Sequence, residues 1–171
     1  MNSKRLVSAL AIAFALGGLG FSADTLAAQN TSTFAVSATV NAACTISGTA
    51  LSFGSFNVLS GSNVDATSTL TATCTNGSAY TVGLNAGLAS GATVSSRKMT
   101  HTVDNTKTLN YSLSTISSGG TNWDDIGGAN VASGTGSGVG QSITVYGRVP
   151  SGQTSPIVGD YSDTITATID F

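Results

Sequence analysis

The chain has 171 residues, of which 8% are charged, 40% are hydrophobic and 21 are glycine. All eight acidic residues are aspartate, whereas a long soluble helix carries Glu, Lys, Arg and Gln on its solvent-facing side, so the composition favours an all-β protein over a helical bundle. A positive mean hydropathy of +0.23 argues against disorder, and a net charge of −2 without a basic cluster gives no support for nucleic-acid binding.

A secretory signal peptide is predicted at residues 1–28. Two basic residues precede an apolar run over residues 6–21, and small residues follow, so cleavage is expected after Ala27 or Ala28. The apolar run is shorter than the ~20 residues that a membrane span needs, which disfavours a retained anchor. We therefore expect residues 29–171 to be exported as one domain of ordinary size.

Export determines which chemistry is expected of the two cysteines. Cys44 and Cys74 are the only cysteines, and an oxidising compartment favours a disulfide between them. With a single histidine in the chain, they cannot provide the four ligands of a structural zinc site. A loop of this size is expected to stabilise the fold by roughly 3.5 kcal/mol, because the crosslink restricts the unfolded chain.

The first predicted strand precedes Cys44. Phe34, Val36, Ala38 and Val40 alternate with smaller or polar residues, and this period of two places them on one face of an extended segment. Asn76-Gly77 is a strong two-residue turn signal between two further strands. Residues 117–140 are rich in Gly and Ser and are predicted to form a loop. The other predicted strands span residues 51–56, 68–75, 79–86, 97–103, 108–116, 142–150 and 163–171.

Many short strands with one inter-strand disulfide favour a β-sandwich over a barrel. The last predicted strand alternates cleanly, and it contains neither the Lys nor the Pro with which proteins usually protect a free strand edge. It ends on the last residue, so nothing is expected to cover that edge. An open edge together with a spare N-terminal strand predicts a subunit that polymerises head to tail.

Several segments together resemble the spore coat protein U domain family, which includes subunits of archaic chaperone-usher pili. They span nearly all of the mature chain, and they end in a C-terminal G-x-Y-x-D-T pattern at residues 159–164. The segments are FAVSATVNAACTI, TLTATCTNGSAYTVGLNAG, LNYSL, Trp123, ITVYGRVPSGQ and GDYSDTITATIDF.

The resemblance implies an incomplete immunoglobulin-like sandwich that lacks its last strand, with the pilin domain at residues 42–171. A periplasmic chaperone would lend a strand to the resulting groove, and a neighbouring subunit's N-terminal extension would replace it at the outer-membrane usher. The extension, residues 29–41, would insert Phe34, Val36, Ala38 and Val40. One edge of the acceptor groove would be lined by Ile165, Ala167, Ile169 and Phe171.

The expected function is therefore that of a structural pilus subunit on the cell surface, serving attachment and biofilm formation as a homopolymer. The alternative is a secreted coat-like surface protein of the same fold. No enzyme activity and no cofactor are expected. His101 lies in a polar stretch without a G-x-S-x-G motif.

Neither Asp124-Asp125 nor the pair Asp160 and Asp163 fits the spacing of a calcium-binding EF-hand loop, so no metal site is expected. In the resembling family, Asp163 belongs to a structural motif that opens the last strand. A lone Trp123 is expected to cap the sandwich core, with an exposed anchor for a partner as the alternative.

Overall fold

The computed structural model describes residues 28–171, and the chain divides into two units after Ala38. The predicted signal peptide lies outside the described residues except for Ala28. Within the described part, no helix is long and apolar enough to cross a membrane. One short 3₁₀ turn, η1 (Val58–Ser60), is the only helical element there, so these residues form an all-β fold.

Residues 28–43 carry no regular secondary structure, and every side chain from 28 to 43 is exposed. Phe34, Val36 and Val40 expose 86%, 85% and 82% of their surface. The period of two predicted a strand here, but a strand needs a partner for its backbone N–H and C=O groups. The described residues provide none for residues 28–40, and only the last residues before β1 bond to Thr75.

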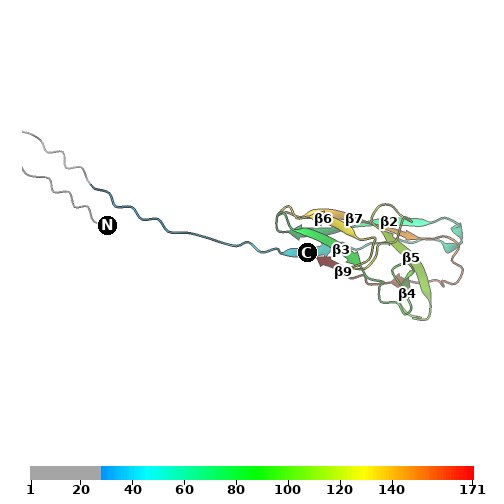
Figure 1. The fold of residues 1–171 in the computed structure, drawn as a ribbon. Helices are drawn as coiled ribbons and strands as arrows, with labels where there is room; N and C mark the ends of the chain where they lie inside the picture. Colours follow the sequence, from blue (N-terminus) through cyan, green and yellow to red (C-terminus); the bar gives the residue numbers. More distant parts are fainter. Residues whose placement is uncertain (1–27) are drawn as a thin grey trace, which may run out of the picture. The chain divides into compact units, whose positions relative to one another are not determined.

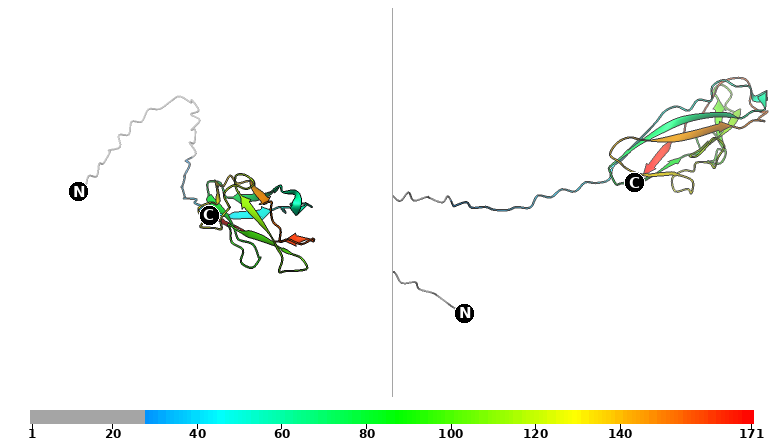
Figure 2. Two further views of the ribbon diagram at one scale, coloured as in Figure 1. Left: turned by 90° about the vertical axis from the view of Figure 1, so that its right-hand side faces the viewer. Right: turned by 90° about the horizontal axis from the view of Figure 1, so that it is seen from above.

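The domain from Thr39 onward contains nine strands in two sheets (Figure 1). The larger sheet has the order β1-β2-β7-β5-β4-β8 and the smaller one β6-β3-β9, and all pairings are antiparallel. β2 and β7, the two longest strands, run side by side along the domain (Figure 2). The strands are β1 (Cys44–Gly48), β2 (Val64–Cys74), β3 (Ala79–Leu84), β4 (Arg97–His101), β5 (Thr108–Ser114), β6 (Ala132–Thr135), β7 (Gln141–Val149), β8 (Tyr161–Ser162) and β9 (Ala167–Asp170).

The core lies between the two sheets and follows from the alternation of each strand. In β2, Leu70, Ala72 and Cys74 are buried while the residues between them face outward. β3 contributes Tyr80 and Val82 from the other sheet. Burial of such side chains stabilises the sandwich by about 1.5–3 kcal/mol for each large one. The remaining core residues are Leu84, Leu109, Tyr111, Leu113, Trp123, Val145 and Val149.

Cys44 and Cys74 form a disulfide. They are directly opposite each other in the β1–β2 ladder, so the crosslink fixes β1 to the end of the longest strand of the larger sheet. The pairing predicted from export and cysteine count is therefore present in the fold.

Asn76-Gly77 forms a turn, but it does not join a hairpin. Gly77 has a φ of 83°, which glycine adopts without strain. β2 pairs with β1 and β7, whereas β3 pairs with β6 and β9. The turn therefore carries the chain from one sheet to the other. The short-range signal predicted the turn correctly, but pairing with more distant strands decided which sheet each strand joined.

Two local predictions were wrong. Residues 51–56, predicted as a strand, make no ladder, although Leu51 and Phe53 are half-buried against the larger sheet. They fit because β7 has Gly147 beneath them: a Cβ there would stand 2.9 Å from Leu51 and 3.0 Å from Phe53. The Gly- and Ser-rich segment 117–140, predicted as a loop, contains β6, whose glycine and small residues hide its strand character.

The last predicted strand is regular over only part of its length. Burial alternates from Tyr161 to Asp170, with Ile165, Ala167 and Ile169 on the half-buried face. Ladder pairing is confined to β8 and β9. Between them, Thr166 still bonds to Asn85, just after β3, with its carbonyl accepting from the Asn85 N–H at 3.1 Å, whereas residues 163–165 lie outside any ladder. The alternation predicted which face is inward, but not where the hydrogen bonds stop.

Candidate functional site

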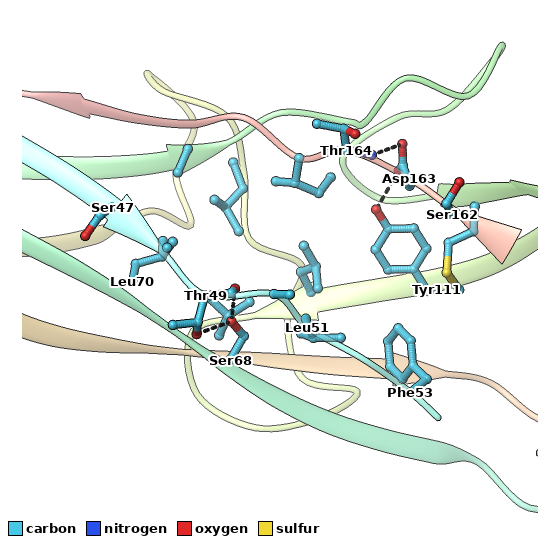
Figure 3. Close-up of a pocket in the computed structure, with 18 of the residues that line it drawn as sticks. Ser47, Thr49, Leu51, Phe53, Ser68, Leu70, Tyr111, Ser162, Asp163 and Thr164 are labelled. Atoms are coloured by element: carbon cyan, nitrogen blue, oxygen red, sulfur yellow. Dashed lines mark hydrogen bonds between the residues drawn. The ribbon is translucent and has the colours of Figure 1, made fainter. Parts of the chain in front are cut away.

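An open groove with a cavity volume of about 650 Å³ runs along one side of the domain. One wall is β1 and the chain that continues from it to Phe53. The other wall is the segment from Tyr161 to Ala167 (Figure 3). The groove is therefore bounded by two segments that lie far apart in the sequence.

Each wall offers an unpaired strand edge. β1 pairs only with β2, and β9 pairs only with β3, so each is the edge strand of its own sheet. The two strands run in opposite directions. Cys44 pairs with Cys74, Asp170 pairs with Thr81, and the turn at residues 75–78 brings Cys74 and Thr81 to the same end. β1 and β9 contact each other, and the groove opens from there between residues 46–53 and 161–167, where one further strand could lie along both segments.

The floor of the groove is apolar and comes from both sheets. Leu70 and Val145 from the larger sheet and Leu84 from the smaller one are buried beneath the opening. Tyr111 and Leu113 of β5 complete the floor. Half-buried Ile46, Leu51, Phe53 and Met99 stand higher on the lining. An apolar floor with half-exposed walls is what a row of alternating apolar side chains would fill.

Polar groups of the groove are already bonded to one another. The Ser68 hydroxyl donates to the Thr49 carbonyl and lies 3.1 Å from the Thr49 hydroxyl (Figure 3). Both are satisfied within the wall, so they need no bound molecule as a partner.

Asp163 fixes the beginning of the second wall. One carboxylate oxygen accepts from the backbone N–H of Leu88 and Thr164, each at 2.8 Å. The other accepts from the Tyr111 hydroxyl at 2.6 Å, and Figure 3 shows the bonds to Thr164 and Tyr111. Burial and the bond to this carboxylate raise the pKa of Tyr111 far above its ordinary value, so the phenol remains a donor. The arrangement is that of a structural motif, as the resemblance implied for Asp163.

The four residues predicted for the groove edge fall in different places. Ile165 and Ala167 line the cavity. Ile169 packs against the core without reaching the cavity lining, and Phe171 exposes 55% of its surface. Of the four predicted residues, only the first two therefore line the groove.

Sequence reasoning missed most of the lining, above all Ile46, Leu51 and Phe53. The segment containing Leu51 and Phe53 was predicted only as a strand, and it follows soon after the strand that contains Cys44. That spacing is the signal that could have placed it beside the open edge. The contributions of β5 and β7 depend on tertiary packing and have no short-range signal.

Other candidate residues are structural. Trp123 is fully buried and its Nε1–H donates to the Val82 carbonyl at 2.8 Å, as the core interpretation predicted. His101 is buried, and its Nδ1 accepts from the backbone N–H of Val103 and Asp104. Arg97 is fully buried and donates to four backbone carbonyls, while burial lowers its pKa. Among residues 28–171, no group of His, Cys, Asp or Glu has the arrangement of a metal site.

Comparison with solved structures finds the same fold. A chain of the crystal structure of the CsuC–CsuE chaperone–tip adhesion subunit pre-assembly complex, from archaic chaperone-usher Csu pili of Acinetobacter baumannii, matches with a TM-score of 0.54 at 21% identity. The match covers 78% of this chain and 41% of that chain, so this chain spans less than half the length of that relative. The fold is an incomplete immunoglobulin-like sandwich.

Sequence comparison defines the family. No curated protein matches the sequence. The family model of the Spore Coat Protein U domain matches residues 30–168, which include the whole groove. This chain therefore belongs to the Spore Coat Protein U domain family.

Proposed function

We propose that this protein is a structural pilus subunit that polymerises by donor-strand exchange. The observation that carries the proposal is an apolar groove between two unpaired strand edges, in a chain whose residues 29–41 alternate, expose their apolar side chains and form no ladder. A neighbour's extension would insert Phe34, Val36, Ala38 and Val40 into the groove.

The dimensions support this assignment. From Phe34 to Val40 is six residue steps, or about 20 Å in an extended strand. The wall from Ile46 to Phe53 is seven steps, or about 23 Å if it is equally extended. The four proposed side chains therefore span nearly the full length of the groove.

The energetics support it too. Phe34, Val36 and Val40 are exposed, and burying each in the groove contributes about 1.5–3 kcal/mol. Ladder bonds to β1 and to the wall that leads into β9 would satisfy backbone groups on three segments at once. Ala38 contributes little area, so the pocket opposite it should be shallow.

Before assembly, a strand from a periplasmic chaperone would occupy the same groove, and a neighbour's extension would replace it at an outer-membrane usher. Export under a signal peptide at residues 1–28 fits this route. The family match and the fold shared with a chain from a chaperone-usher pilus complex support it. The expected product is a surface fimbrium that serves attachment and biofilm formation, without catalysis.

Self-complementation tests the groove and the donor together. In a chain that lacks residues 29–41 at its start, the same segment is joined after Phe171 by a short flexible linker. We expect a soluble monomer whose Tm exceeds that of the uncomplemented domain by roughly 10–20 °C, from about 5 kcal/mol of added burial.

The matched control carries Phe34→Asp and Val36→Asp in the transplanted segment and should gain no stability. Equal melting temperatures for the two fusions would refute the donor assignment. Electron microscopy of surface-sheared material from the intact protein then separates filaments from a coat-like layer, which is the alternative that the family's name suggests.

A further inference from the structure

The two ends of the groove carry different surfaces. At one end, here called the disulfide end, the turn at residues 75–78 and the loop at 136–140 surround Cys74. Gly77 donates to the Gly136 carbonyl at 2.9 Å, and Gly138 donates to the Cys74 carbonyl at 3.0 Å. Val139, on this loop, exposes 65% of its surface.

The opposite end, here called the far end, holds the loops at residues 102–107 and 150–160. The β2–β7 ladder fixes its position, because this ladder begins at Val64 opposite Val149, away from Cys74. Thr102 donates to the Asp160 carbonyl at 2.8 Å, so the two loops are joined.

The far end presents an apolar cap made of Val103, Ile157 and Val158, which expose 88%, 44% and 100% of their surface. His101 holds the cap together, because its Nδ1 accepts from the Val103 N–H and its Nε2 lies 3.3 Å from the Val158 carbonyl. The cap is also continuous with the groove: the Tyr161 hydroxyl, whose ring stacks edge-on against His101, bonds to both backbone groups of Ile157.

The direction of the inserted strand decides which neighbour meets this cap. A donor running parallel to β9 would leave the groove at the disulfide end, where the acceptor's own extension also begins. Each domain would then be joined to both of its neighbours at its disulfide end. Three domains would have to pack around that one end. A donor antiparallel to β9 puts the two junctions at opposite ends, as an open head-to-tail chain requires.

The connection between donor and domain is short. Ala43 and Thr75 exchange bonds, with the Thr75 N–H donating to the Ala43 carbonyl at 2.9 Å and the Ala43 N–H donating to the Thr75 hydroxyl at 3.1 Å. Three residues from Val40 to Ala43 span at most roughly 10 Å. With Val40 seated at the far end of one groove, the next domain's disulfide end must lie close to it.

We propose that the cap of Val103, Ile157 and Val158 is a second contact between consecutive subunits, and that it packs on the disulfide end of the next copy, beside Val139. The inference rests on the proposed function. The partner that covers the cap is a second copy of this chain, because the short connection from Val40 to Ala43 brings the disulfide end of the next copy close to the cap. The exposed apolar side chains of the cap and of Val139 would then be covered in the polymer.

Crosslinking of assembled polymers tests this contact. The chain carrying Val158→Cys and Val139→Cys is assembled on cells of the native host, and sheared polymers are treated with a short bis-maleimide. After heating in detergent, which dissociates uncrosslinked polymers, we expect a ladder of covalent oligomers. Each single-cysteine variant should give no ladder beyond a dimer.

The matched control pairs Ile116→Cys with Val139→Cys, because Ile116 is also strongly exposed but follows β5 away from both ends. With polymers of normal abundance, either of two results would overturn this contact: no covalent ladder from the Val158→Cys and Val139→Cys pair, or an equal ladder from the Ile116→Cys and Val139→Cys pair. Donor-strand exchange would still stand in either case. Absence of polymers from the unsubstituted chain would instead overturn the proposed function.

Discussion

The N-terminal extension and the C-terminal segment have the same sequence pattern and different structures. Residues 33–40 and 161–170 both alternate with a period of two. In the first, every side chain is exposed. In the second, alternate side chains are half-buried, and the end of the segment forms β9 against β3. Alternation therefore records which face a segment can bury, and the available partner decides whether it becomes a strand.

The largest effect is expected from testing which face of the extension inserts into the groove. Phe34→Asp should abolish polymerisation while leaving the domain folded, because it would place a charge in an apolar groove. Ser37→Asp, on the opposite face of the proposed donor strand, should leave polymers largely intact. Heat-sensitive ladders on gels of surface-sheared protein measure both. Similar loss from the two variants would mean that the extension does not insert as a strand.

The phase of the C-terminal segment can be tested in the same way. Ile165→Asp should reduce complementation by the fused donor to a small fraction of its normal Tm gain, because Ile165 lines the groove. Thr166→Asp is the control, since its side chain is exposed. Thermal melts of the self-complemented monomer distinguish them. If Thr166→Asp is the more damaging change, the inward face has been assigned incorrectly.

Loss of the disulfide that joins β1, the strand after the extension, to β2 is expected to have the next largest effect on stability. Replacing Cys44 and Cys74 together by alanine should lower the free energy of unfolding by about 3.5 kcal/mol, since the unfolded chain regains the freedom of a 30-residue loop. Urea unfolding of the self-complemented monomer measures the change. An unchanged midpoint would show that β1 needs no covalent anchor.

The smallest effect is expected at Tyr111. Tyr111→Phe removes a hydrogen bond to the Asp163 carboxylate and should cost about 1.5–3 kcal/mol. The raised pKa also predicts a pH dependence. Above the ordinary tyrosine pKa of about 10, the unfolded chain loses a proton that the folded one keeps, so stability falls as pH rises.

Tyr111→Phe should therefore make the loss of stability above that pH less steep. Urea midpoints measured at neutral pH and at alkaline pH provide the comparison. The same steepness in both proteins would show that Tyr111 does not titrate differently in the folded state.

The sequence predicted the features that depend on local pattern. Composition indicated an all-β fold, the cysteine count indicated the disulfide, and most strands lie where alternation placed them. The inward face of Ile165 and Ala167 also followed from alternation alone.

What it did not predict depends on contacts between distant segments. The Asn76-Gly77 turn changes sheets because β2 pairs with β7 and β3 with β6. Leu51 and Phe53 became a groove wall because Gly147 leaves space beneath them. Neither outcome has a signal within a window of a few residues, since each needs the position of a segment about 50 to 100 residues away.

In the proposed filament, the disulfide would have a mechanical consequence. Tension transmitted along the polymer would enter each domain through its extension and reach the fold at Cys44. From there the crosslink passes the load directly to Cys74, at the end of the strand with the longest ladder in the domain. β1 could not be peeled from its sheet one hydrogen bond at a time. The joint that would yield under force is then the non-covalent one between subunits, and each domain could be pulled apart from its neighbour while remaining folded.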